Sequence, residues 1–367
     1  MFPGTRAVIT TRDACKPVSF SVSATAQNAV FMYPPNPANE SDILGFIHSA
    51  YLNSTGPLLN GTTTITGNYT VNGLFCAPVK NPRNALQVLV HGITYNKTMW
   101  EGLGLGADYN WHGYAQLQGY HTLAIDRLSH GDDTQDLDPI TTVQGPLQLE
   151  IIHQLIQAIR NTGANNALGQ SFKRIAYVGH SYGSILGTAL AGKYPDDIDA
   201  LVCTGFSAFI NGSAILNTWN ISSAAHTEAR FAKLPLGYVA SQTEAVVEAM
   251  FYAGDYDKAI PPVNFAYHDT MTVGEVCYTG FAGPVNYTKP VALIVGELDK
   301  IFCNSATMGC PNILDQTGNI LFPNTTANWF TPQLTGHELT LHNSAQITFQ
   351  WVHNIFLNTI FTSNSSR

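Results

Sequence analysis

The amino-acid sequence predicts an α/β fold in which helices flank a mostly parallel central sheet. From residue 86 onward, short apolar runs alternate with longer segments of helical period. A Gly-x-Ser-x-Gly pentapeptide stands between one of these runs and a helix rich in small residues. The alternation of apolar runs with helical segments is typical of parallel strands joined by helices. The first 80 residues and the interval 206–284 break the pattern, which indicates an N-terminal extension and an insertion.

Length and composition exclude several classes of protein. The 367 residues exceed the roughly 250–300 at which one core stops growing, so we expect one enlarged domain or two. With 17 basic against 25 acidic residues and no basic cluster, the chain lacks the charge pattern of a nucleic-acid binder. Its longest apolar runs are far shorter than the roughly 20 residues that span a bilayer, so we expect no integral membrane segment.

We expect residues 1–80 to form a β-rich segment joined to the core. Residues 18–24 and 62–76 contain many β-branched and aromatic side chains, which favour strands. Pro34, Pro35 and Pro37, which lie between these two stretches, mark a turn, and residues 41–51 predict a short helix.

The core is expected at residues 81–205 and 285–367. Five short apolar runs predict its main strands, at 86–90, 122–125, 175–178, 200–203 and 291–295. A further strand is expected at 329–334. The clearest helices are predicted at 148–160, 184–194 and, closing the chain, about 342–361.

Residues 206–284 predict a helical cap inserted into the sheet domain. Ser241 to Glu244 and Thr272 to Glu275 both show the spacing of a helix start. Many Phe, Trp and Tyr residues lie in this interval, and few charges accompany them. These rings either line a substrate pocket or form the interior of the cap itself.

Ser181 is the candidate nucleophile. It stands at the centre of Gly179-His180-Ser181-Tyr182-Gly183, directly after a predicted strand and before a predicted helix. Such a turn strains the backbone at Ser181 and leaves no room for side chains two residues away, which explains both glycines. The N-terminus of the following helix favours negative charge that develops beside the serine.

A base and an acid for Ser181 follow in the order typical of this turn. Asp299 lies just past a strand end, and His337 follows the last predicted strand. Glu297, two residues before Asp299, is an alternative acid. His342, five residues after His337, is an alternative base.

These motifs resemble the α/β-hydrolase superfamily, and in particular its secreted fungal serine hydrolases and esterases. The resemblance spans about residues 86–361 and includes His91-Gly92, the segment from Asp126 to Gly131, and Gly296-x-x-Asp299. It implies that the backbone N–H groups of Ile93 and Tyr182 form an oxyanion hole. It also implies that Asp126-Arg127 supports the loop beneath the site and that His91 braces the oxyanion loop.

The function expected from these residues is hydrolysis of an ester, thioester or lactone through an acyl-enzyme, with a small, largely apolar substrate. An acyltransferase with the same triad, a peptidase or amidase, and a non-catalytic binding protein are the alternatives. We expect no metal and no cofactor, because neither paired cysteine spacing nor a dinucleotide fingerprint is present. The oligomeric state and the identity of the substrate stay open.

The cysteines and glycosylation sequons indicate a secretory compartment. Six cysteines allow disulfides, of which Cys303–Cys310 is the first expectation and Cys15–Cys76 the second. No charged region followed by an apolar stretch begins the chain, so we expect that a leader has been removed. The alternative is a cytosolic protein whose sequons are unused. Ten Asn-X-Ser/Thr sequons occur, at Asn39, Asn53, Asn60, Asn68, Asn96, Asn211, Asn220, Asn286, Asn324 and Asn364.

Overall fold

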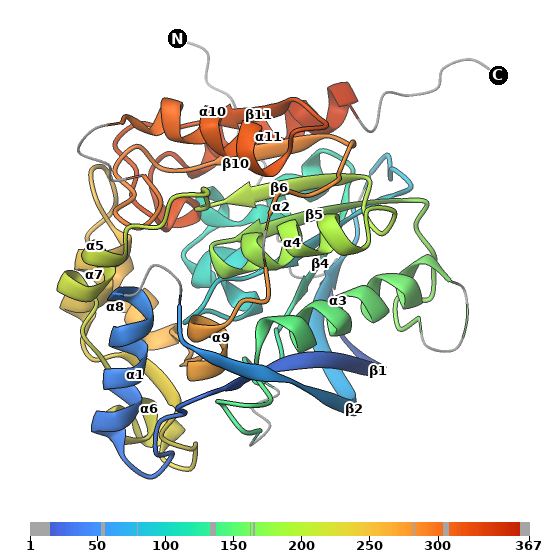
Figure 1. Ribbon diagram of the computed structural model, residues 1–367. Helices are drawn as coiled ribbons and strands as arrows, with labels where there is room; N and C mark the ends of the chain where they lie inside the picture. The colour runs from blue at the N-terminus through green and yellow to red at the C-terminus, as the bar shows by residue number, and fades with distance from the viewer. Residues whose placement is uncertain are drawn as a thin grey trace.

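An eight-stranded sheet forms the centre of the molecule (Figure 1). The computed structural model describes residues 15–52, 56–78, 80–132, 137–161, 163, 166–281, 283–303 and 308–359. In spatial order the strands are β1 (Cys15–Phe31), β2 (Leu59–Cys76), β4 (His121–Ile125), β3 (Ala85–Val90), β5 (Arg174–His180), β6 (Ala200–Thr204), β10 (Val291–Ile294) and β11 (Ala327–Phe330). The first three pair antiparallel and all the others pair parallel, which confirms the predicted fold class.

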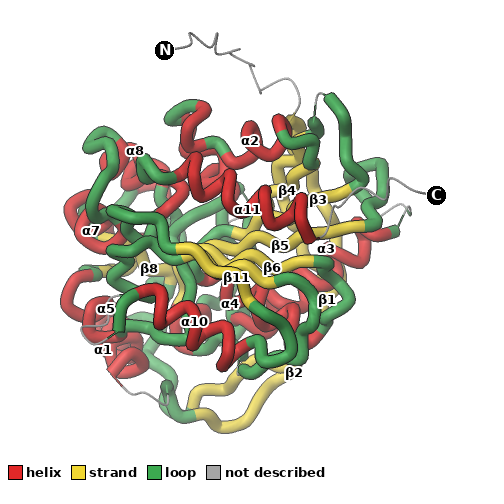
Figure 2. The backbone as a smooth tube through the Cα atoms, turned by 90° about the horizontal axis from the view of Figure 1, so that it is seen from above, coloured by secondary structure: helices red, strands yellow, loops and turns green. Residues whose placement is uncertain are grey.

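Helices cover both faces of this sheet (Figure 2). One face carries α2 and α11, and the other carries α3, α4 and α10. Successive residues of β3 point to opposite faces of the sheet, so that Val88 packs with α3, α4 and α10, and Leu89 packs with α2 and α11. Because both faces are covered, the sequence of β3 is almost wholly apolar. The helices are α2 (Trp111–Leu117), α3 (Gly145–Arg160), α4 (Tyr182–Lys193), α10 (Cys310–Leu321) and α11 (Ala345–Thr359), and the short 3₁₀ turns are η2 (Lys97–Gly104), η3 (Ala107–Tyr109), η4 (Ala229–Phe231) and η5 (Leu339–Leu341).

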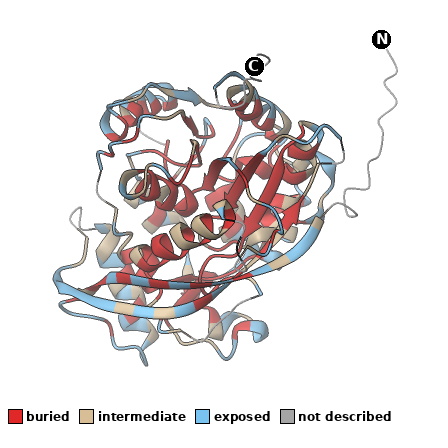
Figure 3. Ribbon diagram, turned by 90° about the vertical axis from the view of Figure 1, so that its right-hand side faces the viewer, coloured by how far each residue is buried: buried red, intermediate tan, exposed pale blue. Residues whose placement is uncertain are grey.

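The N-terminal strands are longer than the sequence predicts. β1 and β2 pair along almost their whole length, from Cys15 opposite Cys76 to Phe31 opposite Leu59. Side chains of β1 alternate between a face packed on the core and an exposed face, and the hairpin runs along the lower edge of the molecule in Figure 3. The disulfide between Cys15 and Cys76 closes this hairpin at the end where β2 joins the sheet, which confirms the second expected disulfide.

The interval 206–284 contains a small sheet as well as helices, so the expectation of a purely helical insertion was incomplete. Its strands are too short to give a readable alternation of polar and apolar residues. Thr272 and Glu275 form the predicted capping box, whereas the helix that begins at Glu244 is capped by Thr243 and not by Ser241. The elements are α5 (Gly212–Thr218), β7 (Ile221–Ser223), α6 (Ala224–Thr227), β8 (Tyr238–Ser241), α7 (Glu244–Phe251), α8 (Ile260–Tyr267), β9 (Met271–Thr272) and α9 (Val273–Cys277), with β7, β8 and β9 paired antiparallel.

The N-terminal helix α1 (Glu40–Leu52) belongs spatially with this insertion. It is the short helix expected at residues 41–51, and it packs against α5, α9 and β7 (Figure 1). The helix α1 and the insertion at residues 206–284 are far apart in the sequence, but together they form one layer beside the sheet. In the part of the chain that is described, no helix is both long and apolar enough to cross a membrane.

Two element boundaries near the C-terminus differ from the expectation. The last strand ends at Phe330, four residues early, because the chain then turns and Thr335 pairs with Gly254 of the insertion. The final helix begins at Ala345 and not at His342, because the backbone of residues 339–341 forms a 3₁₀ turn.

A buried glutamine links the central strand to two helices. Gln87 accepts a hydrogen bond from Trp111 Nε1 at 2.8 Å, and its amide nitrogen lies 3.0 Å from His353 Nε2. His353 Nδ1 lies 2.7 Å from the carbonyl oxygen of Phe349 and therefore carries the ring proton, which leaves Nε2 as the acceptor for Gln87. Burial lowers the pKa of His353 from 6.5 to about 4, so this ring is neutral in the folded chain.

We expect acid to weaken the fold through His353. Between pH 6.5 and about 4 the unfolded chain binds a proton at this residue while the folded chain does not. The free energy of unfolding should fall over that range by up to about 3 kcal/mol. His353→Gln keeps an acceptor for Gln87 but binds no proton. Denaturant titrations at about pH 7 and about pH 4.5 should show a smaller loss in this variant, and equal losses would contradict the assignment.

Candidate active site

Ser181 lies at a strained turn between β5 and α4. Its backbone has φ 52° and ψ −114°, a conformation that side-chain-bearing residues rarely adopt. A Cβ on Gly179 would lie 2.5 Å from the backbone of Gly183, and a Cβ on Gly183 would lie 2.2 Å from the carbonyl oxygen of Val90. Both glycines are therefore required by backbone contacts, as the sequence predicts.

The loop after β3 packs directly against this turn. A Cβ on Gly92 would lie 3.0 Å from the Cβ of Ser181. The backbone N–H groups of Ile93 and Tyr182, the two predicted oxyanion donors, form no hydrogen bond with any other described residue. Two free amides thus flank the serine.

Arg127 holds the loop that contains one of these amides. Its Nε donates to the carbonyl oxygen of His91 at 3.1 Å, and its Nη2 donates to that of Gly92 at 3.1 Å. The Gly92 carbonyl and the Ile93 N–H belong to the same peptide group. A cationic donor on the carbonyl polarises that group and strengthens its N–H as a donor. The guanidinium also lies 4.8 Å from the centre of the Tyr182 ring.

The ring of His91 also contacts the loop that Arg127 holds, and it carries its proton on Nδ1. The backbone N–H of Arg127 donates to His91 Nε2 at 3.1 Å, so the ring proton is on Nδ1, which donates to the Gly92 oxygen at 2.7 Å. Burial, with Arg127 nearby, holds the pKa of His91 well below its ordinary value and keeps the ring neutral. His91 therefore braces the loop, as the family resemblance implies.

A carboxylate from the insertion balances the charge of Arg127. Glu275 of α9 is fully buried and accepts hydrogen bonds from Arg127 and from Gln148 Nε2. His130 Nε2 lies 3.0 Å from the same carboxylate. Burial alone would raise the pKa of Glu275, but Arg127 and His130 hold it well below its ordinary value. This pair therefore stays ionised and connects the insertion to the loop beside Ser181.

His337 and Asp299 meet at the carboxyl edge of the sheet. His337 Nδ1 lies 2.7 Å from Asp299 Oδ2, and both side chains are buried. Asp299 Oδ1 accepts the backbone N–H groups of Ile301 at 2.8 Å and Phe302 at 3.0 Å. Burial would raise the pKa of Asp299, but His337 and these two amides hold it below its ordinary value. Asp299 is thus an ionised partner that fixes the imidazole.

A disulfide lies directly after the loop that holds Asp299. Cys303 is bonded to Cys310, the first residue of α10, which confirms the first expected bridge. The two remaining cysteines, Cys203 and Cys277, are free and buried.

The alternative acid and base lie elsewhere. Glu297 is exposed, and its Oε2 accepts the backbone N–H of Leu334 at 3.0 Å. His342 uses both ring nitrogens on backbone groups, Nδ1 at 2.7 Å from the Glu338 oxygen and Nε2 accepting from the Gly336 N–H at 3.0 Å. Neither residue lines the pocket at Ser181.

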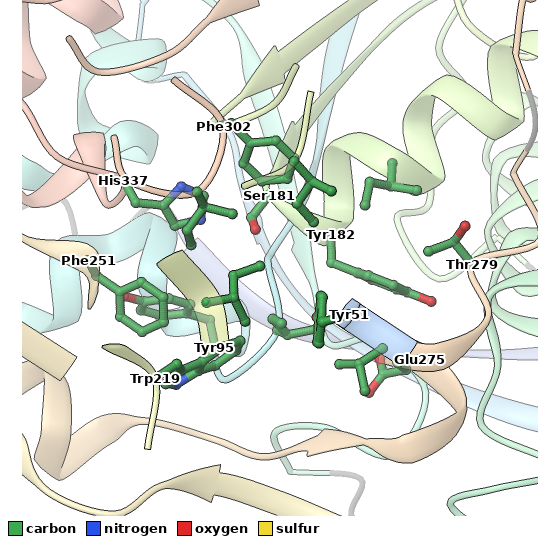
Figure 4. A pocket seen from close by; sticks show the side chains of 16 residues that line it. Tyr51, Tyr95, Ser181, Tyr182, Trp219, Phe251, Glu275, Thr279, Phe302 and His337 are labelled. Atoms are coloured by element: carbon green, nitrogen blue, oxygen red, sulfur yellow. The ribbon is translucent and has the colours of Figure 1, made fainter. Parts of the chain in front are cut away.

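An apolar pocket opens at Ser181 and His337 (Figure 4). Ser181 and His337 form no direct hydrogen bond in this structure, but active-site contacts of this kind often shorten only when substrate binds. Of the side chains that line the pocket, only four are polar or charged. The lining consists of Tyr51, Ile93, Tyr95, Ser181, Tyr182, Ile185, Ile210, Ile215, Trp219, Phe251, Glu275, Val276, Thr279, Ile301, Phe302 and His337.

Several of these pocket residues were not foreseen. Tyr95 and Phe302 lie two and three residues from predicted site residues, and this proximity was the only available signal. Tyr51 comes from the N-terminal helix α1, for which no local pattern indicates a role at the site. Within residues 206–284, Trp219 and Phe251 line the pocket, while other rings, such as Phe231, pack elsewhere.

Comparison with known proteins gives a family match and structural neighbours. The model of the alpha/beta hydrolase family matches residues 87–336. Rv0554 from Mycobacterium tuberculosis has a TM-score of 0.51 at 12% identity, over 80% of this chain and 95% of that one. Carboxylesterase CesB from Bacillus subtilis has a TM-score of 0.47 at 14% identity, over 79% and 89%. No curated protein matches this chain by sequence. Identities this low show likeness of fold alone.

Gly183→Ala should destabilise the protein, because the new methyl group would meet the backbone of the central strand β3. We expect a loss of at least about 2 kcal/mol in the free energy of unfolding. Gly45→Ala is the matched control, since its Cβ meets nothing within 4 Å and alanine favours the helix α1. Thermal or denaturant unfolding of both variants tests this, and a similar effect at the two sites would refute the steric argument.

Proposed function

We propose that this chain, which belongs to the alpha/beta hydrolase family, is a serine hydrolase that cleaves an ester, thioester or lactone through an acyl-enzyme. The observation that carries the proposal is the pocket shared by Ser181 and His337, with His337 bonded to the buried Asp299. The family match extends to residue 336 and so includes the turn at Ser181 and the loop at Asp299.

In this mechanism Ser181 Oγ attacks the carbonyl carbon while His337 Nε2 takes its proton. Asp299 holds the Nδ1 proton and stabilises the imidazolium that forms. The N–H groups of Ile93 and Tyr182 bind the oxyanion, with the first polarised through Arg127. His337 then returns the proton to the leaving oxygen or sulfur. A water molecule, deprotonated by His337, releases the acid and restores Ser181.

The position of His337 assigns the two sides of the pocket. The leaving group must receive its proton from His337, so it lies on the side of Phe251 and Trp219 (Figure 4). The acyl group then lies on the other side of Ser181, against Tyr182 and Tyr51. Both sides are mainly aromatic or aliphatic. We therefore propose a small, largely apolar substrate and a cap formed by residues 206–284 together with α1.

We also propose that the protein is a secreted glycoprotein, as the resemblance to secreted fungal members implies. Its two disulfides suit an oxidising compartment. Asn96 and Asn211 are the sequons least suited to a glycan, because each is partly buried and its side chain caps a helix, η2 and α5 respectively. Asn53 and Asn364 lie outside the described residues. Six other sequon side chains are exposed, at Asn39, Asn60, Asn68, Asn220, Asn286 and Asn324.

A fluorophosphonate probe should label the protein at Ser181 alone, because only a serine with a base beside it attacks phosphorus at a useful rate. Ser181→Ala should abolish the labelling, as read by mass spectrometry. His337→Ala should lower turnover of a p-nitrophenyl ester at least about a hundredfold, and His342→Ala much less. Undiminished labelling of Ser181→Ala, or the reverse order of the two histidines, would overturn the assignment.

Apolar acyl groups should be preferred over charged ones. Each Å² of apolar ligand surface that the pocket covers contributes roughly 25 cal/mol, while a charged acyl group finds no free counter-charge there. We expect kcat/KM for p-nitrophenyl esters to rise from acetate to longer or aromatic acyl groups. A steady fall from acetate upward, with charged acyl groups accepted equally, would refute this preference. An added alcohol acceptor in the same assay distinguishes a hydrolase from an acyltransferase.

A further inference from the structure

A second pair of ionisable side chains lies directly behind the proposed triad. His180 precedes Ser181, and Glu338 follows His337. Both side chains are fully buried, and neither lines the substrate pocket. His180 Nε2 and Glu338 Oε2 lie 3.2 Å apart, and neither atom has a hydrogen-bond partner elsewhere in the described chain.

The hydrogen bonds around this pair fix how many protons it holds. His180 Nδ1 lies 3.1 Å from the Thr204 hydroxyl oxygen, and that hydroxyl donates its only proton to the Gly179 carbonyl at 2.9 Å. His180 Nδ1 must therefore be the donor to Thr204. If Nε2 and the carboxylate both lacked a proton, two lone pairs would face each other in a buried site. One further proton must lie between them.

The surroundings of Glu338 place that proton on His180. Glu338 Oε1 accepts the hydroxyl of Thr340, which stabilises the ionised carboxylate. Burial would raise the pKa of Glu338, but His180 and this hydroxyl hold it below its ordinary value. An imidazolium and a carboxylate, with no net charge, satisfy all of these contacts.

His180 also touches the proposed base. The rings of His180 and His337 have centroids 4.9 Å apart. Gly205, with φ 56°, lies against both rings, because a Cβ there would sit 2.8 Å from His180 Cε1 and 3.0 Å from His337 Cε1. The two imidazoles therefore pack on one backbone wall, and His337 cannot move toward that wall.

The charged groups that face His337 come from three elements. Asp299 bonds to it from the loop after β10, Glu338 adjoins it in the chain, and His180 approaches from the end of β5. Phe251 and Phe302 supply apolar contacts on other sides. The Tyr95 phenol lies beside Glu338, and burial together with Glu338 raises the pKa of this phenol.

We propose that His180 and Glu338 are positioning residues for the reaction of Ser181, in which the His180 imidazolium cancels the Glu338 charge beside His337. With the two charges balanced, Asp299 is the only uncompensated anion at the base. The anion that acts on His337 is then Asp299, which holds the ring for accepting the Ser181 proton. This inference rests on the proposed function and adds a limit to the pH range over which the base works.

The test is the acid limb of the pH profile of kcat/KM for a p-nitrophenyl ester. His180→Asn leaves the Glu338 carboxylate unbalanced, so the limb should move to higher pH by about one unit or more. Adding Glu338→Gln to that variant removes the carboxylate and should return the limb to its original position. A purely structural role predicts further loss in the double variant. His112→Asn is the matched control, since His112 is also buried and bonded to a threonine, Thr122, but lies away from the site.

The remaining outcomes contradict either this inference or the proposed function. An unmoved limb in His180→Asn, or a shifted limb that Glu338→Gln does not restore, overturns the inference. If His180→Asn does not fold, NMR of the histidine-labelled chain decides, because at one and the same pH the His180 ring should carry protons on both nitrogens in the natural chain and on one nitrogen in Glu338→Gln. A signal that does not change overturns the inference as well. Should the natural chain hydrolyse no ester and escape labelling at Ser181, the proposed function itself fails, a result distinct from an unmoved limb.

Discussion

The buried ion pair of Arg127 and Glu275 is the interaction on which the arrangement of the site depends. Arg127 follows β4 of the core, and Glu275 belongs to α9 of the insertion. Through its other donors Arg127 holds the carbonyls before Ile93. Placing two charges out of water is costly, and a buried pair is compensated only when hydrogen bonds satisfy both partners, as Gln148 and His130 help to do here. The Arg127–Glu275 ion pair therefore holds in place both the loop that contains Ile93 and the insertion that contains Glu275.

Two pairs of ionisable side chains thus lie near Ser181. One supports the predicted oxyanion loop, and the other, His180 with Glu338, lies behind His337. The space between them is mainly apolar and aromatic. In such surroundings an unbalanced charge would act strongly on the base, because little water screens it. In the arrangement that we propose, the local pairing of each charge leaves the Asp299 carboxylate as the main charge that acts on His337.

The sequence predicted those features that local chemistry imposes. Short, mostly apolar runs mark β3 to β6 and β10, since strands buried on both faces tolerate few polar residues. The two glycines around Ser181 were predicted from the sterics of the turn, and the structure shows the contacts that demand them. Both disulfides were also anticipated. Periodicity failed for the small sheet β7-β8-β9, because strands of two to four residues contain too few alternations to be read.

The sequence by itself determined the fold class, the strained turn at Ser181 and the order of candidate nucleophile, acid and base. Each of these follows from residues close together in the chain, where steric demands and hydrophobic period act directly. Only the tertiary structure decided that Tyr51 lines the pocket, that Glu275 meets Arg127 and that Glu338 meets His180. Glu275 and Arg127 are more than a hundred residues apart in the sequence, and so are Glu338 and His180, and Tyr51 and Ser181. No local sequence pattern can therefore predict these contacts. Their contacts exist because the sheet brings its strand ends to one edge and the insertion folds over that edge.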